Sequence, residues 1–340
     1  MLTNRQLLVL QVIIDEFIQT AQPIGSRSIA KKEDVSFSSA TIRNEMADLE
    51  EMGFIEKTHS SSGRVPSEKG YRFYVDHLLS PFRLSKSDLN IITDTFEKEM
   101  VEFEQVVQKS AQVLSNLTNY TSIILGPEVF ETKLKQLQII SLSAHTAVAI
   151  LVTNTGHVEH RSFSVPAKIR PSDLEKMVNI LNERLVGVPI IQLHEKLSTE
   201  IALLLHSYME DVDLAYQYLQ SAFFDEQQVK LYVGGKTNIL MQPEFKDIEK
   251  IRSLYSVIEQ EDEIADLLRA ATGGLKVSIG QENKIDAMQD CSLITATYSL
   301  GDNQLGTIAL LGPTRMEYSR VISLLNVLSS RLTKTFHSWY

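Results

Sequence analysis

The sequence predicts an α+β protein that begins with a winged helix-turn-helix domain. Residues 1–80 show three short amphipathic helix patterns followed by a basic hairpin pattern. Residues 137–165 and 292–311 show the alternation of apolar positions that is typical of strands. A mainly helical stretch separates these two strand-rich pieces, which indicates one α+β domain with an insertion.

The first two helices are predicted close to the N-terminus. Apolar residues recur every three or four positions from Leu7 to Ile18, so they line one face of a helix. Pro23 ends this helix because the residue before a proline avoids helical geometry, and Ser26 is placed to cap a short second helix. The basic residues of the second helix are Arg27, Lys31 and Lys32.

The third helix is predicted to begin at Ser38, its N-cap, and to close at Gly53. Its apolar face consists of Ile42, Met46 and Leu49. The alternating residues 54–59 then predict a strand, and residues 60–63 predict a turn before a second strand. Three helices followed by a basic hairpin are the winged-helix order.

The outer face of the third helix carries side chains suited to reading DNA. With Ile42 directed to the core, an advance of about 100° per residue turns Arg43 and Asn44 outward. Arginine can bond guanine bidentately and asparagine can bond adenine in the same way. Small or hydroxyl-bearing residues at the start of the helix suit close approach and phosphate contact; they are Ser39, Ala40 and Thr41.

Positive charge is local in this chain. A net charge of −10 argues against a protein that coats nucleic acid without specificity. Residues 57–72, however, contain four basic side chains and one acidic one. The hairpin there is predicted to contact the DNA backbone or the adjacent minor groove through Lys57, His59, Ser60, Ser61, Ser62, Gly63 and Arg64, with Arg27 and Lys31 of the second helix also predicted as DNA contacts.

The rest of the chain alternates helical and strand patterns. One long amphipathic helix is predicted from Ile92 to Leu117 and links the first domain to the body. Strands are then predicted within 137–165, followed by a helix at 173–186. The predicted parts are 1–80, 81–196 with the linker helix and the first part of the body, 197–272 as the inserted domain, and 273–340 as the second part of the body.

Composition narrows the class of protein. The apolar runs are far shorter than the roughly 20 residues that cross a bilayer, and the first residues do not resemble an export signal. The single cysteine, Cys291, fits a reducing compartment, so a cytoplasmic location is expected.

Four further features favour structural roles. The stretch 233–237 ends like a phosphate-binding loop, but Lys230 stands where its first glycine is required. His157 and His160 are three apart on a predicted strand and so point to opposite faces, which disfavours a shared metal. Cys291 has no companions for catalysis, and Arg315 is expected to form a structural salt bridge. The sequence shows no catalytic constellation, and neither a cofactor nor a metal is expected.

Three stretches are distinctive: SSATIRNEMADLE at 38–50, SGRVPSEKGYRFYVD at 62–76 and GPTRMEYSR at 312–320. They resemble the heat-inducible transcription repressor family HrcA, and the likeness extends over essentially the whole chain. The resemblance implies a winged helix, a GAF-like domain and a dimerising domain inserted within the latter. It also implies a homodimer that binds double-stranded DNA at CIRCE, an inverted-repeat operator upstream of chaperone operons, and represses them until heat shock, with the chaperonin GroEL as regulatory partner.

Two other functions compete with this hypothesis. A GAF-like body could bind a metabolite, which would make the chain a small-molecule-responsive winged-helix regulator. Alternatively, the α+β body could be an enzyme and the first domain a protein-interaction module. Operator binding, thermal-shift screening with metabolites and a search for turnover discriminate the three.

Overall fold

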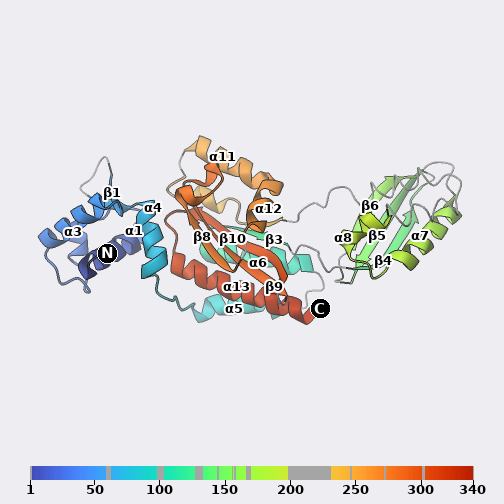
Figure 1. Ribbon diagram of the computed structural model, residues 1–340, viewed down its shortest axis with the longest axis horizontal. Helices are drawn as coiled ribbons and strands as arrows, with labels where there is room; N and C mark the ends of the chain where they lie inside the picture. The colour runs from blue at the N-terminus through green and yellow to red at the C-terminus, as the bar shows by residue number, and fades with distance from the viewer. Residues whose placement is uncertain are drawn as a thin grey trace. The chain divides into compact units, whose positions relative to one another are not determined.

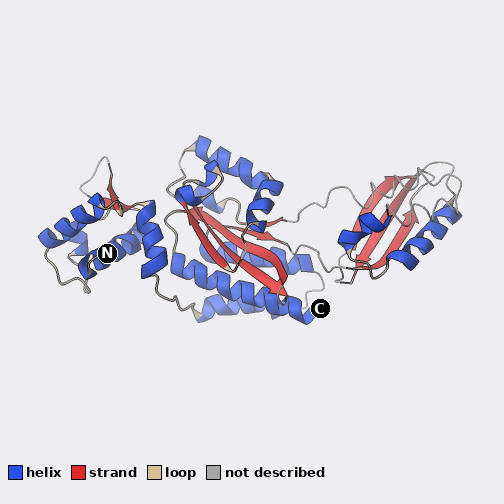
Figure 2. Cartoon of the chain, in the orientation of Figure 1, coloured by secondary structure: helices blue, strands red, loops and turns tan. Residues whose placement is uncertain are grey.

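In the computed structural model, the strands of the described residues form three sheets, of two, five and three strands (Figure 2). The described residues are 2–58, 63–97, 103–126, 133–143, 145–154, 156, 158–165, 170–197, 231–245, 247–271, 273–300 and 303–339. The chain divides into two compact units. The first comprises Met1–Glu97, Gln108–Leu125 and Leu231–Lys334, and the second comprises Lys98–Val107, Gly126–Lys230 and Thr335–Tyr340.

The N-terminal part of the first unit, called the head below, has the predicted winged-helix order (Figure 1). Its elements are α1 (Asn4–Thr20), α2 (Ser26–Ile29), α3 (Ser39–Glu51), β1 (Ile55–Lys57), β2 (Arg64–Pro66), α4 (Glu68–Phe73) and a π-helical turn, η1 (Tyr74–Leu78). β1 and β2 pair antiparallel, with Lys57 opposite Arg64. The prediction of three helices followed by a hairpin is confirmed.

The core of the head lies between α1 and α3. α1 begins with a capping box in which Thr3 Oγ1 accepts from the amide of Gln6 and the Gln6 side chain accepts from the amide of Thr3. Its buried face meets α3, and the buried apolar residues of the two helices are Val9, Leu10, Ile13, Ile14 and Ile18 in α1 and Ile42, Met46 and Leu49 in α3. Because each such side chain contributes about 1.5–3 kcal/mol when fully buried, this contact stabilises the head.

The start of α2 differs from the prediction. Its N-cap is Gly25, and Ser26 is the first helical residue. Ser26 is buried, and its hydroxyl lies 3.1 Å from the hydroxyl of Ser39 at the start of α3. The serine therefore ties the two helices together instead of capping its own. Gly53 has a φ of +78° directly after α3, which is the left-handed conformation that glycine adopts most readily.

The body of the first unit is built on a five-stranded antiparallel sheet with the order β7-β3-β10-β9-β8. The strands are β3 (Thr121–Leu125), β7 (Leu231–Gly234), β8 (Leu275–Ile279), β9 (Cys291–Leu300) and β10 (Asn303–Pro313). β9 and β10 form the hairpin predicted for 292–311. The helices of the body are α5 (Lys86–Glu97), α6 (Phe103–Thr118), α11 (Ile248–Glu259), α12 (Glu261–Arg269) and α13 (Tyr318–Trp339), with short 3-10 turns η3 (Asn238–Met241), η4 (Gly280–Glu282) and η5 (Asp286–Met288).

Helices cover both faces of this sheet. Thr307 Oγ1 donates to the carbonyl of Leu268 in α12 (3.1 Å), and Thr307 pairs with Thr297 of β9. Ser292 of the same strand lies five positions away, and its hydroxyl is 2.7 Å from that of Tyr318 in α13. Since neighbouring residues of a strand point to opposite faces, α12 and α13 lie on opposite sides of the sheet, as Figure 1 shows.

The stretch predicted as one long helix is described as two helices with different partners. α5 lies along α13, where Arg331 donates to Thr93 (3.3 Å) and Arg320 pairs with Asp88. α6 lies on the sheet, where the hydroxyl of Ser122 donates to the carbonyl of Ala111. Residues 98–102, between the two helices, lie outside the described part of the chain.

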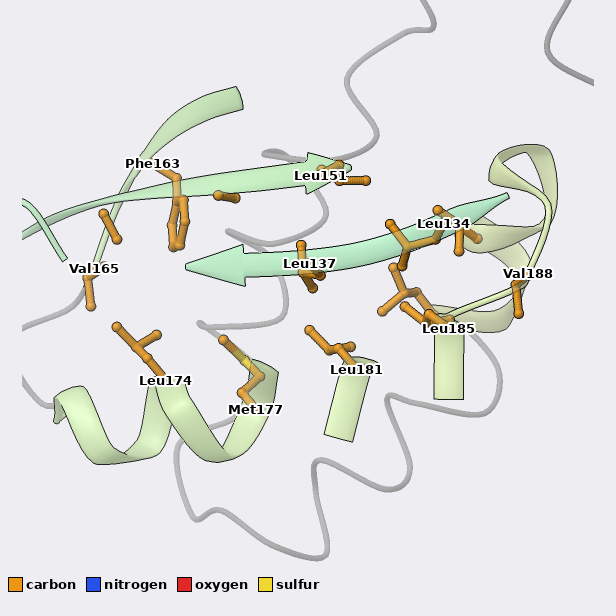
Figure 3. Packing of buried hydrophobic residues seen from close by; sticks show 14 residues of the cluster. Leu134, Leu137, Leu151, Phe163, Val165, Leu174, Met177, Leu181, Leu185 and Val188 are labelled. Atoms are coloured by element: carbon orange, nitrogen blue, oxygen red, sulfur yellow. The ribbon is translucent and has the colours of Figure 1, made fainter. Parts of the chain in front are cut away.

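The second unit is a three-stranded antiparallel sheet, β4-β5-β6, packed against helices. Its described elements are β4 (Leu134–Ser141), β5 (Thr146–Thr153), β6 (Val158–Ser164), α7 (Pro171–Leu185) and α8 (Ile190–Lys196). Figure 3 shows Leu137, Leu151 and Phe163 of the sheet on the side of α7, which contributes Met177 and Leu181 to the same cluster. The strands and the helix predicted for 137–186 are confirmed.

The units divide the chain differently from the predicted domain boundaries at 196 and 272. β4–β6 belong to the second unit and form no ladder with the five-stranded sheet, whereas β7, α11 and α12 belong to the first. The second unit thus interrupts the first between β3 and β7. Period-two alternation identifies a strand but not the sheet that it joins, so the sequence did not show that the strands within 137–165 pair apart from the hairpin at 292–311.

No described helix combines the length and the apolar character that a membrane span needs. The described residues also include no group of three or more His, Cys, Asp or Glu side chains placed to hold a metal ion.

Candidate nucleic-acid interface

The exposed face of α3 is the centre of the candidate interface. Ser38 caps the helix, because its hydroxyl accepts from the amide of Thr41 at 3.1 Å. With Ile42 fully buried against α1, the side chains of Arg43 and Asn44 are exposed. Ala40 and Ala47 are exposed on the same helix, so no bulky side chain at these positions keeps the backbone from a surface opposite.

The two hydroxyl residues at the start of α3 already have partners within the head. Ser39 is bonded to Ser26, and Thr41 Oγ1 lies 3.0 Å from the hydroxyl of Ser38. Both are half-buried. The free amides of the first turn are therefore better placed than these hydroxyls to meet a phosphate.

The basic side chains of the head fall into two groups. Within its described residues, four are exposed and have no ion pair or hydrogen bond: Arg27, Lys31, Arg43 and Lys57. The other five are held by the protein itself: Arg5 by Glu45, Lys32 by Glu16, Arg64 by Glu50, Lys69 by the carbonyl of Met52, and Arg72 by Glu282. A cation with a protein partner must give it up to bind phosphate, so the first group is the one available to DNA.

Arg64, predicted as a DNA contact, uses its guanidinium inside the head. Its Nε donates to Glu50 Oε2 (2.8 Å), and a terminal nitrogen lies 2.6 Å from the same oxygen. The side chain is 18% exposed. Glu50 stands in the last turn of α3, so the pair fixes the second strand of the hairpin to the end of that helix. The sequence alone does not single out Glu50 as the partner of Arg64, because the other acidic residues of the head carry the same charge.

The hairpin is also held at its base. Gly63 is buried, and a Cβ there would lie within 3.0 Å of Pro23. Arg64 exchanges backbone hydrogen bonds with Ile24, at 2.8 and 2.9 Å. The glycine is required because the hairpin crosses the loop after α1 at this distance. His59, Ser60, Ser61 and Ser62, predicted at the tip, lie outside the described residues.

The features outside the head have structural surroundings. Cys291 is buried, and desolvation raises the pKa of its thiol to about 12, so the nucleophilic thiolate does not form at neutral pH. At the end of β7, a Cβ on Gly234 would overlap the carbonyl of Ala111, so close packing explains that glycine. Arg315 forms the expected salt bridge, with Glu244. His160 is exposed, and His157 lies outside the described residues.

Comparison with known proteins identifies the family. Residues 1–76 match the family model described as the winged helix-turn-helix transcription repressor HrcA DNA-binding domain, and residues 104–322 match the HrcA protein C terminal domain. The chain belongs to the HrcA family. HrcA proteins are heat-inducible transcription repressors, so this chain is a DNA-binding repressor and not an enzyme.

A relative and a solved structure extend the comparison. The heat-inducible transcription repressor HrcA of Oceanobacillus iheyensis is 63% identical over 100% of this chain and 99% of its own length. A crystal structure of a hypothetical protein matches with a TM-score of 0.72 over 100% of both chains, at 24% identity. The first comparison supports the HrcA family over the full length, and the second concerns the fold alone.

Proposed function

We propose that this HrcA-family repressor binds CIRCE, an inverted repeat upstream of chaperone operons, as a cytoplasmic homodimer and represses those operons until heat stress. The chaperonin GroEL is its proposed partner and helps to keep it in the active form. The observation that carries the proposal is the set of unpaired cations around α3 in a chain whose net charge is −10. Local positive charge of this kind suits one specific duplex contact.

Each residue of the surface has a proposed role. Arg43 and Asn44 read base edges in the major groove, and Ala40 allows the close approach. Arg27, Lys31 and Lys57 contact phosphates, as does the amide of Ser39. Thr41 supports the start of α3, because its amide bonds to the hydroxyl of Ser38. The hairpin tip, from His59 to Ser62, reaches the backbone or the adjacent minor groove. Gly63, also predicted as a DNA contact, is buried against Pro23 and supports the base of the hairpin instead. Arg64 acts indirectly, because it holds the hairpin to α3 through Glu50.

The body is proposed to be GAF-like, with the second unit as the inserted dimerising domain. Support comes from the five-stranded antiparallel sheet covered by helices on both faces, and from the place of the second unit between β3 and β7. A twofold axis in the dimer would match the twofold symmetry of an inverted repeat.

Gel-shift titration tests the target. The full chain is expected to bind the complete inverted repeat cooperatively and a single half-site much more weakly, since linking two sites raises apparent affinity by about 10²–10⁴. Purified chaperonin is expected to increase the fraction of repressor that binds. Equal affinity for the repeat, the half-site and random DNA would contradict the proposed operator.

Lys57→Ala is expected to weaken binding to every sequence by a similar factor. A phosphate contact carries no base information, and its loss reduces the slope of log K against log salt concentration by about 1. Lys69→Ala is the matched control, because the Lys69 ammonium is held by the carbonyl of Met52 above the ring of Phe54. The control should leave the slope unchanged. A slope that is the same in both variants would rule out the phosphate contact of Lys57.

A further inference from the structure

Arg72 of α4 connects the head to the body. Its Nε donates to Glu282 Oε1 at 2.8 Å, and a terminal nitrogen donates to the carbonyl of Val277 in β8 at 2.7 Å. Burial alone would raise the pKa of Glu282, but the hydrogen bond from Arg72 brings it below its usual value. The planar guanidinium fixes direction as well as distance, because its donors form a rigid fork.

The loop that carries Glu282 is shaped for this contact. Gly280 has a φ of +55°, and a Cβ there would overlap the carboxylate of Glu68. That carboxylate accepts from the amide of Gln281 at 3.2 Å. Two side chains of α4, one turn apart, therefore hold the same short loop of the body.

A second arginine holds the head at a different place. Arg315, in the loop before α13, donates to the carbonyl of Ile18 near the end of α1 at 2.7 Å. Glu244 and Gln242 hold the same guanidinium from the body. This side chain is 13% exposed, so its charge is largely removed from water and depends on these partners.

Packed tyrosines complete the junction. The rings of Tyr71 in α4 and Tyr318 in α13 lie 6.0 Å apart, and both residues are buried. The Tyr71 hydroxyl has no hydrogen-bond partner among the described residues, so its contribution here is the ring. One contact would leave the head free to pivot. Contacts from α1 and α4, made to three different segments of the body, define a single orientation.

We propose that Arg72 and Arg315 are positioning residues that set which half-site spacing the repressor accepts. Both hold the head at one angle on the body, which removes a pivot between head and body as a source of variation in the separation of the two α3 helices. Neither guanidinium needs to touch DNA. The inference rests on the proposed dimer and its inverted repeat, and it adds a specificity that the reading surface of α3 does not carry.

Operators whose half-sites are moved apart by two base pairs test this inference. Such an insertion shifts one half-site by about 7 Å and rotates it by about 70°. The wild-type chain is expected to lose about a hundredfold in affinity, because both heads no longer engage together. The double variant Arg72→Ala, Arg315→Ala should lose less than about tenfold, while its affinity for a single half-site stays that of the wild type.

Two further variants serve as a second disruption of the same contact and as a control. Glu282→Ala removes the partner of Arg72 from the body and leaves the head sequence intact. It should therefore also reduce the loss of affinity that the two-base-pair insertion causes. Arg269→Ala is the control, because Arg269 pairs with Asp266 within α12, and it should keep the wild-type profile. An unchanged profile in the double variant, or an equal loss on half-site and full repeat, overturns the inference. Failure of the wild-type chain to bind any repeat would instead overturn the proposed function.

Discussion

Arg43→Ala is expected to weaken operator binding by about 1–3 kcal/mol and to relax discrimination at one base position. Arg43 is exposed on α3 and has no partner within the described head, so its loss removes a base contact without leaving a buried acid unpaired. Binding to random DNA should change much less. Gel-shift titrations on the operator, on single-base variants and on random DNA measure both effects.

The matched control for this variant is Arg5→Ala. Arg5 is also an arginine of the head, but it pairs with Glu45 and lies over the ring of Phe37. Its replacement should leave the ratio of operator to random affinity unchanged. If Arg43→Ala lowers both affinities equally, Arg43 contacts the phosphate backbone and does not read a base.

Gly70→Ala is expected to destabilise the head by about 3 kcal/mol, at the upper end of the cost of overpacking. A Cβ at Gly70 would lie under 3.0 Å from the carbonyl oxygen of Phe54, which is backbone and cannot turn away. That oxygen also accepts from the amide of Ser67, the N-cap of α4. Both α4 and the base of the hairpin should loosen together.

Hydrogen exchange of the full chain, measured by mass spectrometry, can localise this effect. Amides of α1 and α3 should exchange faster in Gly70→Ala, while those of the five-stranded sheet keep their protection. Gly25→Ala is the control, because its Cβ meets nothing within 4 Å and its φ of −102° is an ordinary one. Equal protection of α1 in Gly70→Ala and Gly25→Ala would show that the Phe54 contact is not rigid.

The local elements of the head follow from local signals. The hydroxyl of Ser38 caps α3 by bonding an amide three residues on, and the apolar spacing from Ile42 to Leu49 orients the helix. Both signals lie within one or two turns of sequence, so no distant partner decides them. For the same reason, the exposure of Arg43 and Asn44 could be predicted before the fold was known.

Partners that lie far apart in the sequence could not be predicted in this way. Lys57 and Arg64 face each other across the hairpin, and both carry a positive charge. Lys57 is exposed, whereas Arg64 turns to Glu50. Distinguishing the two requires the position of α3 relative to the hairpin, which only the packed head defines. The separate sheet that β4–β6 form could not be predicted for the same reason, because strand pairing depends on residues far apart in the sequence.

The position of the second unit has a consequence for how the chain folds. Leu125 at the end of β3 pairs with Leu231 at the start of β7, although roughly a hundred residues separate them, and closing a loop costs entropy that grows with its length. If the intervening unit condenses first, its two ends draw together and that entropic cost falls before the ladder forms. We therefore expect the second unit to fold before β3 and β7 pair, because its contacts close shorter loops than the ladder that joins its two flanking strands.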